Sequence, residues 1–305
     1  MRTRRLGVAG PFVSVVGLGG NNFGSRLNQD SATAVVHAAL DAGVTLFDTA
    51  DIYGAFGGGR AGDSERMLGA ALRGRRSEIV LATKFGMAFD DQDRGPRGSR
   101  AYIRWAVEGS LRRLGTDHID LYQYHEPDGV TPVAETLGAL GELITEGKIR
   151  FAGCSNTQEP AGFVSAQARY HLLDRSLETG LGPACATAGV SILPYYPLAN
   201  GLLSGKYQGG APPPEGSRLS WREGWLTEAA LDRVEALRAF GARQGRTLLE
   251  VAIGGLAALP SVGSVIAGAM TADQVTANAA AAEWEPDATQ LKELDEIVPS
   301  GSRVV

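Results

Sequence analysis

Ionisable side chains stand where three neighbouring apolar runs of the chain end. The run VTLFD ends in Asp48, and Tyr53 follows it; IVLATK ends in Lys84 and IDLYQYH ends in His125. A lysine ammonium stabilises a nearby phenolate and lowers the pKa of the tyrosine, and an aspartate keeps a buried lysine charged. A histidine beside the phenol can donate a hydrogen bond to a substrate oxygen. The four residues therefore predict a site that protonates an oxygen on which negative charge develops, as when hydride reaches a carbonyl carbon.

Each of these residues also has a structural interpretation. Asp48 and Lys84 could form an ion pair that closes one end of a barrel, and His125 could be a half-buried histidine with its hydrogen bonds satisfied. Independent structural roles seldom bring four such residues to adjacent strand ends, so the catalytic interpretation is favoured. Asp51, in the same stretch, is interpreted as a loop residue that bonds local backbone amides.

The spacing of apolar residues predicts alternating strands and helices. The strand-like runs are residues 15–19, 44–48, 79–84, 119–125, 149–154, 163–167, 190–194 and 262–268. The helix-like segments are residues 31–43, 64–73, 99–114, 131–146, 176–188, 227–259 in two pieces, and 273–282. Buried strands separated by helices favour a parallel sheet covered on its outside, and their number suits a closed (β/α)8 TIM barrel, an α/β fold whose active sites lie at the carboxyl ends of the strands. An open doubly wound sheet is the alternative, although GLGGNN does not reproduce the G-x-G-x-x-G dinucleotide fingerprint.

Two connections in this barrel are unusual. The segment RRLGVAGPFVSVVG contains two short extended pieces, which predict an N-terminal β-hairpin that plugs the bottom of the barrel. Only residues 157–162 separate the fifth run from the sixth, whereas a parallel crossover normally needs about a dozen residues or more. We therefore expect the fifth outer helix to be missing or vestigial, with less apolar cover for its neighbours and lower stability. A deletion from an ordinary barrel is a further hypothesis for this gap.

The composition excludes several classes of protein. The chain has 305 residues, 44% of them hydrophobic, and a net charge of -5 that provides no electrostatic footprint for nucleic acid. Neither its two cysteines nor its four histidines have the spacing of a metal site, so no metal is expected. No run resembles a signal peptide or could span a bilayer, which favours the cytoplasm. Residues 1–305 are expected to form one domain, and their sequence specifies no oligomeric state.

Seven motifs, in order along nearly the whole chain, resemble the aldo-keto reductases. They are GVTLFDTADIYG, DSERMLGAAL, IVLATKFG, LGTDHIDLYQYHEPD, GKIRFAGCSN, LPYYPLANGLLSGKY and VIAGAMTADQVTANAAA. The resemblance implies a (β/α)8 barrel that reduces aldehydes or ketones to alcohols with a nicotinamide cofactor, usually NADPH. It implies that Tyr53 is the general acid, that Lys84 and Asp48 tune its pKa, and that His125 orients the substrate. The alternative is a cofactor-binding regulatory or inactive barrel with little turnover.

The resemblance also implies positions for the nicotinamide and the pyrophosphate. Ser155, Asn156 and Gln167 would hold the carboxamide, and Tyr195 would stack on the ring. The loop PLANGLLSGKY would surround the pyrophosphate with Leu198, Gly201 and Leu203, and would place Lys206 near a phosphate. From the residues alone, turn capping, barrel packing and a solvated lysine would explain the same set.

A phosphate site is expected after the last strand. Thr271 and Gln274 have the spacing of a capping box, so a helix should begin here and present free N–H groups to an anion. The resemblance implies that Gly268, Gln274 and Asn278 contact the phosphate, although a merely well-capped helix has the same pattern. Family members that prefer NADPH commonly have lysine or arginine near the start of this loop, whereas this chain has Met270 and no charge-assisted clamp. NADPH is the first choice and NADH is possible.

The substrate pocket is expected to be open and permissive. Asn22, Phe23, Tyr53 and Trp105 would line it for a small aldehyde or ketone, together with two glycine-rich loops, residues 55–62 and 87–98. Trp105 could equally pack in the core of its helix.

Overall fold

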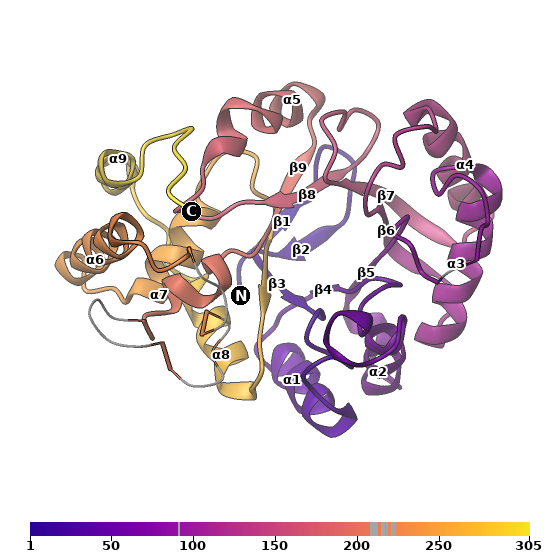
Figure 1. Ribbon diagram of the computed structural model, residues 1–305, viewed down its shortest axis with the longest axis horizontal. Helices are drawn as coiled ribbons and strands as arrows, with labels where there is room; N and C mark the ends of the chain where they lie inside the picture. The colour runs from indigo at the N-terminus through magenta and orange to yellow at the C-terminus, as the bar shows by residue number, and fades with distance from the viewer. Residues whose placement is uncertain (91, 208–212, 215–216, 218, 221–223) are drawn as a thin grey trace.

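Eight parallel strands form one sheet in the computed structural model, which describes residues 1–90, 92–207, 213–214, 217, 219–220 and 224–305. In spatial order they are β10 (Val265–Gly268), β3 (Val16–Gly19), β4 (Leu46–Asp48), β5 (Val80–Phe85), β6 (Ile119–Tyr124), β7 (Ile149–Ser155), β8 (Ser165–Arg169) and β9 (Ser191–Tyr195). The two ends of the sheet meet where Ile192 bridges to Val262 and accepts a hydrogen bond from Gly263 N at 2.9 Å. The sheet is therefore a nearly closed barrel, which confirms the predicted TIM-barrel class (Figure 1).

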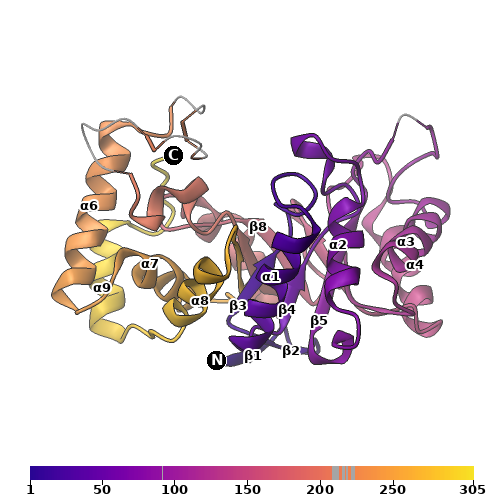
Figure 2. The ribbon, with the colours of Figure 1, turned by 90° about the horizontal axis from the view of Figure 1, so that it is seen from below.

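Helices surround the barrel as the apolar spacing predicts (Figure 2). They are α1 (Gln29–Asp41), α2 (Asp63–Ala71), α3 (Arg100–Leu114), α4 (Val133–Thr145), α5 (Leu181–Ala188), α6 (Glu228–Arg243), α7 (Leu248–Glu250), α8 (Ala272–Ala281) and α9 (Ala288–Ile297). A π-helical turn, Val251–Gly255, follows α7 directly. The helix α9 was not among the predicted segments, although Asp287 and Gln290 form a capping box at its start.

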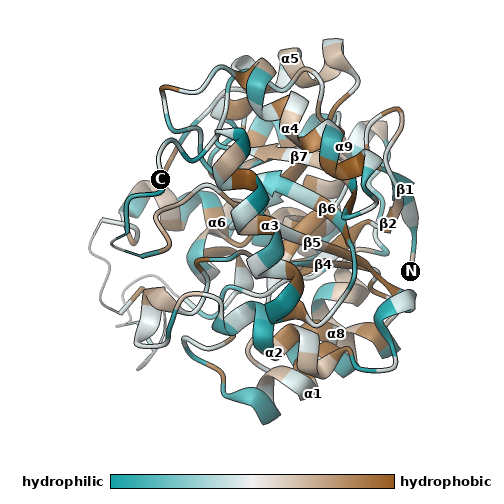
Figure 3. Ribbon diagram, turned by 90° about the vertical axis from the view of Figure 1, so that its right-hand side faces the viewer, coloured by the Kyte–Doolittle hydropathy of each residue, from teal (hydrophilic) through white to brown (hydrophobic). Residues whose placement is uncertain are grey.

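The apolar side chains fall into an inner and an outer layer. Successive strand residues point to opposite faces, so one set lies inside the barrel and the other packs beneath the helices. The inner cluster includes Leu46, Ala82, Leu121 and Leu193. The larger cluster lies between the strands and the helices. Figure 3 shows the corresponding hydrophilic residues on the outward side of α2 and α3.

The N-terminal hairpin closes the bottom of the barrel. β1 (Thr3–Arg5) pairs with β2 (Phe12–Ser14) in an antiparallel sheet of its own. Leu6 and Val13 are fully buried and belong to the inner apolar cluster. This confirms the predicted hairpin, which lies at the lower end of the barrel in Figure 2.

No helix connects β7 to β8, as the short spacing predicts. All residues from 156 to 164 are described, and they form only turns and irregular backbone. The outer side chains of the two strands are small, namely Ala152, Cys154, Ala166 and Ala168, yet each is at most 7% exposed. Gly162 allows the connection to approach α4, because a Cβ at this position would lie 2.8 Å from Leu137 Cδ1. Small outer side chains therefore limit the loss of apolar cover that a missing helix would otherwise cause.

Candidate active site

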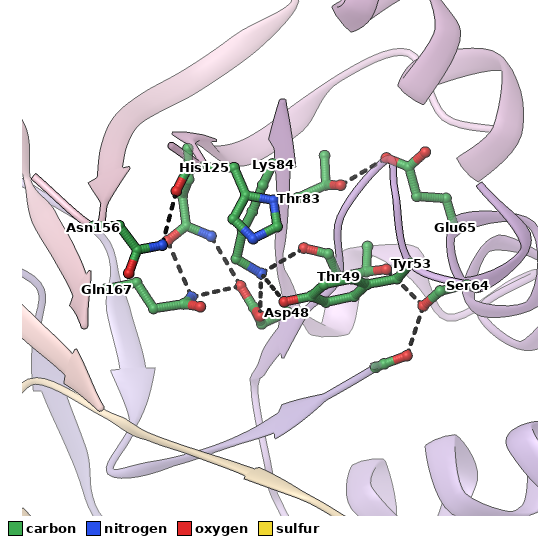
Figure 4. Close-up of polar contacts among 12 residues, drawn as sticks. Asp48, Thr49, Tyr53, Ser64, Glu65, Thr83, Lys84, His125, Asn156 and Gln167 are labelled. Carbon is green, nitrogen blue, oxygen red and sulfur yellow. Dashed lines mark hydrogen bonds and ion pairs between the residues drawn. The ribbon is translucent and has the colours of Figure 1, made fainter. Parts of the chain in front are cut away.

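The barrel brings four ionisable residues to one place at its carboxyl end (Figure 4). Asp48 ends β4, Lys84 lies near the end of β5, and His125 directly follows β6. Tyr53 lies in the turn after β4, where its N–H donates to Ala50 O at 3.2 Å. Parallel strands in register place their carboxyl ends at the same edge, which explains why these positions converge.

Lys84 is the centre of the cluster. Its ammonium nitrogen Nζ donates to Asp48 Oδ2 at 2.6 Å, to the Thr49 carbonyl at 2.8 Å and to the Tyr53 hydroxyl at 3.2 Å. Burial has the largest single effect and disfavours the charged lysine, but Asp48 and Tyr53 together outweigh it, and the pKa of Lys84 is raised. The lysine is therefore an ammonium that directly contacts the phenol.

The phenol of Tyr53 is protonated in the resting site. Tyr53 is partly buried, and this desolvation raises its pKa above the ordinary value of 10.0, while Lys84 lowers it only in part. The pKa is therefore higher than normal, whereas the sequence predicted a lowered one. Lys84 does lower the pKa, as predicted, but the prediction left out the desolvation, which has the larger effect. The phenol can still give up its proton to a neighbouring oxygen that becomes strongly basic during reaction.

His125 is a neutral imidazole beside the phenol. Burial, followed by the charge of Lys84, lowers the pKa of His125 to about 3. Its ring meets that of Tyr53 edge to face, with the centroids 5.8 Å apart. A neutral imidazole keeps one N–H that can donate to an oxygen, so His125 can orient a substrate without adding a second cation.

Two glutamines hold Asp48 from the other side. Gln123 on β6 and Gln167 on β8 each donate from Nε2 to Asp48 Oδ1 at 2.9 Å. Gln167 Nε2 also lies 3.3 Å from Gln123 Oε1. Gln123 was not anticipated, although a buried glutamine on the inward face of strand IDLYQY is unusual enough to suggest a role. Asp48 thus accepts hydrogen bonds at both carboxylate oxygens.

The residues expected around the nicotinamide lie next to this cluster. Asn156 has a left-handed backbone with φ of 52° and donates from Nδ2 to the carbonyl of His125 at 3.1 Å. Its Oδ1 accepts from the Tyr195 hydroxyl at 3.0 Å. Ser155 precedes it at the end of β7 and is buried. The structure therefore brings Ser155, Asn156, Gln167 and Tyr195 together at the mouth of the barrel.

The loop after β9 winds tightly through residues expected near the pyrophosphate. A 3-10 segment, Ala199–Ser204, contains Gly201 at φ of 97° and is flanked by Leu198. Leu203 is fully buried, and Lys206 Nζ lies 5.3 Å from the centroid of the Tyr207 ring. Both amide atoms of Asn200 are buried and lack a partner among the described residues. Asn200 was not predicted, and its unpaired amide is unusual for a buried group.

The helix α8 begins where the capping pattern predicts. Thr271 accepts a hydrogen bond from Gln274 N at 3.3 Å, and Gln274 Oε1 accepts from Met270 N at 2.8 Å. Asn278 is buried one turn further along the helix. Gly268 ends β10, and a Cβ there would meet no atom closer than Asn22 Nδ2 at 3.6 Å. The helix start is thus ordered, with open space beside the preceding strand.

The residues expected to line the substrate pocket occupy three different environments. Asn22 donates to the Ala269 carbonyl at 3.3 Å and so lies near the end of β10. Phe23 is fully buried in the outer apolar cluster. Trp105 lies on α3, where Arg94 packs over its ring at 4.0 Å and Phe89 meets it edge to face. Trp105 therefore holds the loop that follows β5.

Asp51 is a second buried carboxyl group behind the cluster. Its N–H donates to the Lys84 carbonyl at 3.1 Å, which anchors this turn against β5 and turns the side chain inward. Both carboxyl oxygens are enclosed and lack a hydrogen bond of good geometry to any described residue. Of the expected bonds to local backbone amides, only an interaction with the Ile52 N–H is found, and it lowers the pKa of Asp51. Burial raises the pKa of Asp51 well above its ordinary value of 3.8 and Glu65 adds to this, while Arg113, the Ile52 amide and Lys84 act in the opposite direction.

Replacing Asp51 with asparagine is expected to stabilise the protein at neutral pH. Above the pKa of an unfolded aspartate the folded state binds more protons than the unfolded one, so the free energy of unfolding falls as pH rises. Each unit of difference between the two pKa values corresponds to about 1.4 kcal/mol. Urea unfolding at pH 4 and pH 7 would show a smaller decline for Asp51→Asn than for the wild type. The control is Asp232→Asn on the exposed side of α6. An equal decline in all three proteins would refute a raised pKa for Asp51.

The structure is thus a parallel α/β barrel that holds Asp48, Tyr53, a charged Lys84 and a neutral His125 at one end. The sequence profile of the Aldo/keto reductase family matches residues 15–299. The chain therefore belongs to the aldo-keto reductase family.

Relatives support this assignment over the whole chain. The uncharacterized oxidoreductase YrpG of Bacillus subtilis (strain 168) is 35% identical, covering 96% of this chain and 95% of that protein. A protein of Oryza sativa subsp. japonica described as a probable voltage-gated potassium channel subunit beta is 32% identical, covering 94% and 92%. The holo form of the aldo-keto reductase AKR11C1 from Bacillus halodurans superposes with a TM-score of 0.81 at 34% identity, covering 99% and 98%.

The described residues contain neither a metal-binding cluster nor a membrane-spanning helix. Within the ranges given above, no group of three or more histidine, cysteine or carboxylate side chains is arranged to hold a metal ion. No helix there has the length and apolar composition needed to cross a membrane.

Proposed function

We propose that this protein reduces an aldehyde or ketone to an alcohol, with NADPH as hydride donor and Tyr53 as proton donor. The observation that carries the proposal is that Lys84 Nζ contacts Asp48 at 2.6 Å and the Tyr53 hydroxyl at 3.2 Å in the same buried cluster. This arrangement is suited to a phenol that must lose its proton as negative charge appears next to it. We further propose that residues 1–305 act as one domain.

Each residue of the site has a separate role in carbonyl reduction. The nicotinamide cofactor supplies a hydride when it is bound. His125, as a neutral N–H donor, and the Tyr53 hydroxyl hold the carbonyl oxygen. Tyr53 transfers its proton to that oxygen, and the ammonium of Lys84 stabilises the phenolate that remains. Asp48 keeps Lys84 charged and fixes the position of its Nζ.

Several features of the structure suit the proposed cofactor. The buried, unpaired amide of Asn200 lies in the loop expected near the pyrophosphate, so a bound ligand could supply its missing partner. The amino end of α8 lies beside open space at Gly268, and the amino end of a helix suits a phosphate. Asn156, Gln167 and Tyr195 surround the place proposed for the nicotinamide.

A fluorescence titration with NADPH and, separately, with NADH tests the cofactor assignment. We expect NADPH to bind more tightly than NADH. NADH should also bind measurably, because Met270 provides no charged partner that would select for a 2'-phosphate. In the variant Met270→Lys the affinity for NADPH should rise, since a charge-assisted hydrogen bond contributes about 1.5–3 kcal/mol, while that for NADH should not change. Reduction of a panel of aldehydes and ketones then tests turnover. Binding of neither nucleotide would refute the proposed function.

A regulatory barrel is the second candidate. One matched relative is described as a probable potassium channel subunit beta, so this fold occurs under more than one functional description. Lys84 contacts both Asp48 and Tyr53, and the ring of His125 meets that of Tyr53, which favours turnover. Tight NADPH binding without reduction of any carbonyl in the panel would instead favour the regulatory role.

A further inference from the structure

The Lys84 ammonium has one acceptor for each of its three protons. Besides Asp48 Oδ2 and the Tyr53 hydroxyl, its Nζ contacts the carbonyl oxygen of Thr49 at 2.8 Å. All three acceptors belong to the short segment that ends β4 and turns toward α2. An ammonium carries three donors and no acceptor, so the other two acceptors leave one proton of Lys84 for the phenol.

The peptide group that carries the Thr49 carbonyl has little other support. The N–H of Thr49 donates to the Ala82 carbonyl at 2.9 Å, and that of Asp51 donates to the Lys84 carbonyl at 3.1 Å, as in a parallel ladder. The peptide between Thr49 and Ala50 lies between these two bonds. Within the described residues, neither its N–H nor its carbonyl forms a backbone hydrogen bond. Its orientation therefore depends on the side chain of Thr49 as well as on Lys84.

The side chain of Thr49 is held by a chain of hydroxyl groups. Thr49 Oγ1 lies 2.7 Å from Ser64 Oγ, and Ser64 Oγ donates to the Gly20 carbonyl at 2.8 Å. A carbonyl can only accept, so the single hydroxyl proton of Ser64 is used at Gly20, and Thr49 must be the donor to Ser64. The Gly20 N–H donates in turn to the Asp48 carbonyl at 2.7 Å, which closes a ring of contacts around the end of β4.

Ser64 also supports the turn at Tyr53. It is the second residue of α2, and its N–H donates to the Tyr53 carbonyl at 3.3 Å. The start of α2 thus holds Thr49 through a hydroxyl and Tyr53 through the main chain (Figure 4). Thr49 and Ser64 are both fully buried, so water does not compete for these bonds.

We infer that Thr49 is a positioning residue whose hydroxyl, anchored on Ser64, directs the Lys84 ammonium toward the phenol of Tyr53. The hydroxyl acts through the orientation of the Thr49 carbonyl. With this acceptor in place, the third proton of Lys84 points at the Tyr53 oxygen and stabilises the phenolate that remains after proton transfer. The inference rests on the proposed function, because this phenolate forms only if Tyr53 is the proton donor.

The test measures turnover in two variants that differ in this hydroxyl. Thr49→Val keeps the branched shape of the side chain and removes the donor, whereas Thr49→Ser keeps the donor. With NADPH and the best substrate of the panel, kcat should fall about tenfold in Thr49→Val, the equivalent of one net hydrogen bond lost from the transition state. In Thr49→Ser it should stay within about threefold of the wild type, because the bond to Ser64 can still form. KM and the dissociation constant of NADPH should stay within about twofold in both, as for an interaction that matters only in the transition state.

Ser64→Ala removes the same anchor from its other side, so kcat should again fall about tenfold. The double variant with Thr49→Val should lose no more than the more affected single variant, since both changes remove one interaction. Circular dichroism shows which variants fold, and Ser64→Ala carries the test alone if Thr49→Val does not.

Two results would overturn the role of the Thr49 hydroxyl while carbonyl reduction by the wild type stands. One is an equal kcat in folded Thr49→Val and Thr49→Ser, and the other is an unchanged kcat in folded Ser64→Ala. Absence of turnover in the wild type would instead overturn the proposed function and this inference with it.

Discussion

Replacing Tyr53 with phenylalanine should lower carbonyl turnover by about 100- to 10,000-fold, the range typical for a positioned acid. The lost hydroxyl is the group that Lys84 contacts at 3.2 Å, and no other described residue supplies an acid at this place. His125 cannot replace it, because burial lowers the pKa of His125 to about 3 and leaves the ring neutral. Cofactor affinity should stay within about twofold, since the ring of residue 53 is kept.

Stopped-flow and steady-state measurements with the best substrate of the panel would check this. Tyr102→Phe is the control, because it removes a buried phenol that bonds the Met87 carbonyl outside the four ionisable residues. Turnover in Tyr53→Phe close to that of the wild type would remove Tyr53 from its role as acid. A loss of cofactor binding in parallel with turnover would point instead to a structural defect.

Replacing Asp48 with asparagine should cost about 3–5 kcal/mol of unfolding free energy, as expected when one partner of a buried ion pair is removed. The variant leaves the Lys84 ammonium fully buried without its carboxylate. The new amide also has an NH2 group, which must face either Lys84 or the NH2 groups of Gln123 and Gln167. The pKa of Lys84 should then fall, because burial disfavours its charge and the carboxylate no longer offsets this. Turnover should fall as well, since the phenolate loses its cation.

The double variant Asp48→Asn with Lys84→Met separates stability from catalysis. Removing both charges replaces the unpaired ammonium by an apolar chain, so part of the lost unfolding free energy should return. Turnover should not return, because the phenol still has no ammonium beside it. Chemical denaturation and kinetics on the two variants provide both quantities. A single variant as stable as the wild type would mean that Lys84 readily loses its proton in the folded protein.

The barrel could be predicted because buried parallel strands are continuous apolar runs in sequence. The ends of those runs located Asp48, Lys84 and His125 without any knowledge of side-chain contacts. The absence of a helix between β7 and β8 followed from the number of connecting residues alone. The connection must run back along the full length of one strand before the next parallel strand begins, and too few residues remain for a helix. The helix α9 was missed because its stretch carries few apolar residues, with only Leu294 buried.

Properties that depend on three-dimensional enclosure could not be predicted in this way. The pKa of Tyr53 changes direction once burial is weighed against Lys84, and the inward turn of Asp51 is visible only when its main chain is anchored to β5. Gln123 was overlooked because its role depends on a residue of another strand, Gln167, whose amide it meets across the barrel. Such roles arise from pairs of residues that are distant in sequence.

The short passage from β7 to β8 also affects the order in which the barrel can assemble. Gly153 pairs with Ser165, which follows it closely in sequence. Val16 pairs with Val265, which lies near the opposite end of the chain. Each doubling of a closed loop costs only about 0.6 kcal/mol of entropy, but the difference between these two closures spans several doublings. The short separation in sequence therefore favours early pairing of β7 with β8 during folding. The long separation between β3 and β10 favours late pairing of these two strands.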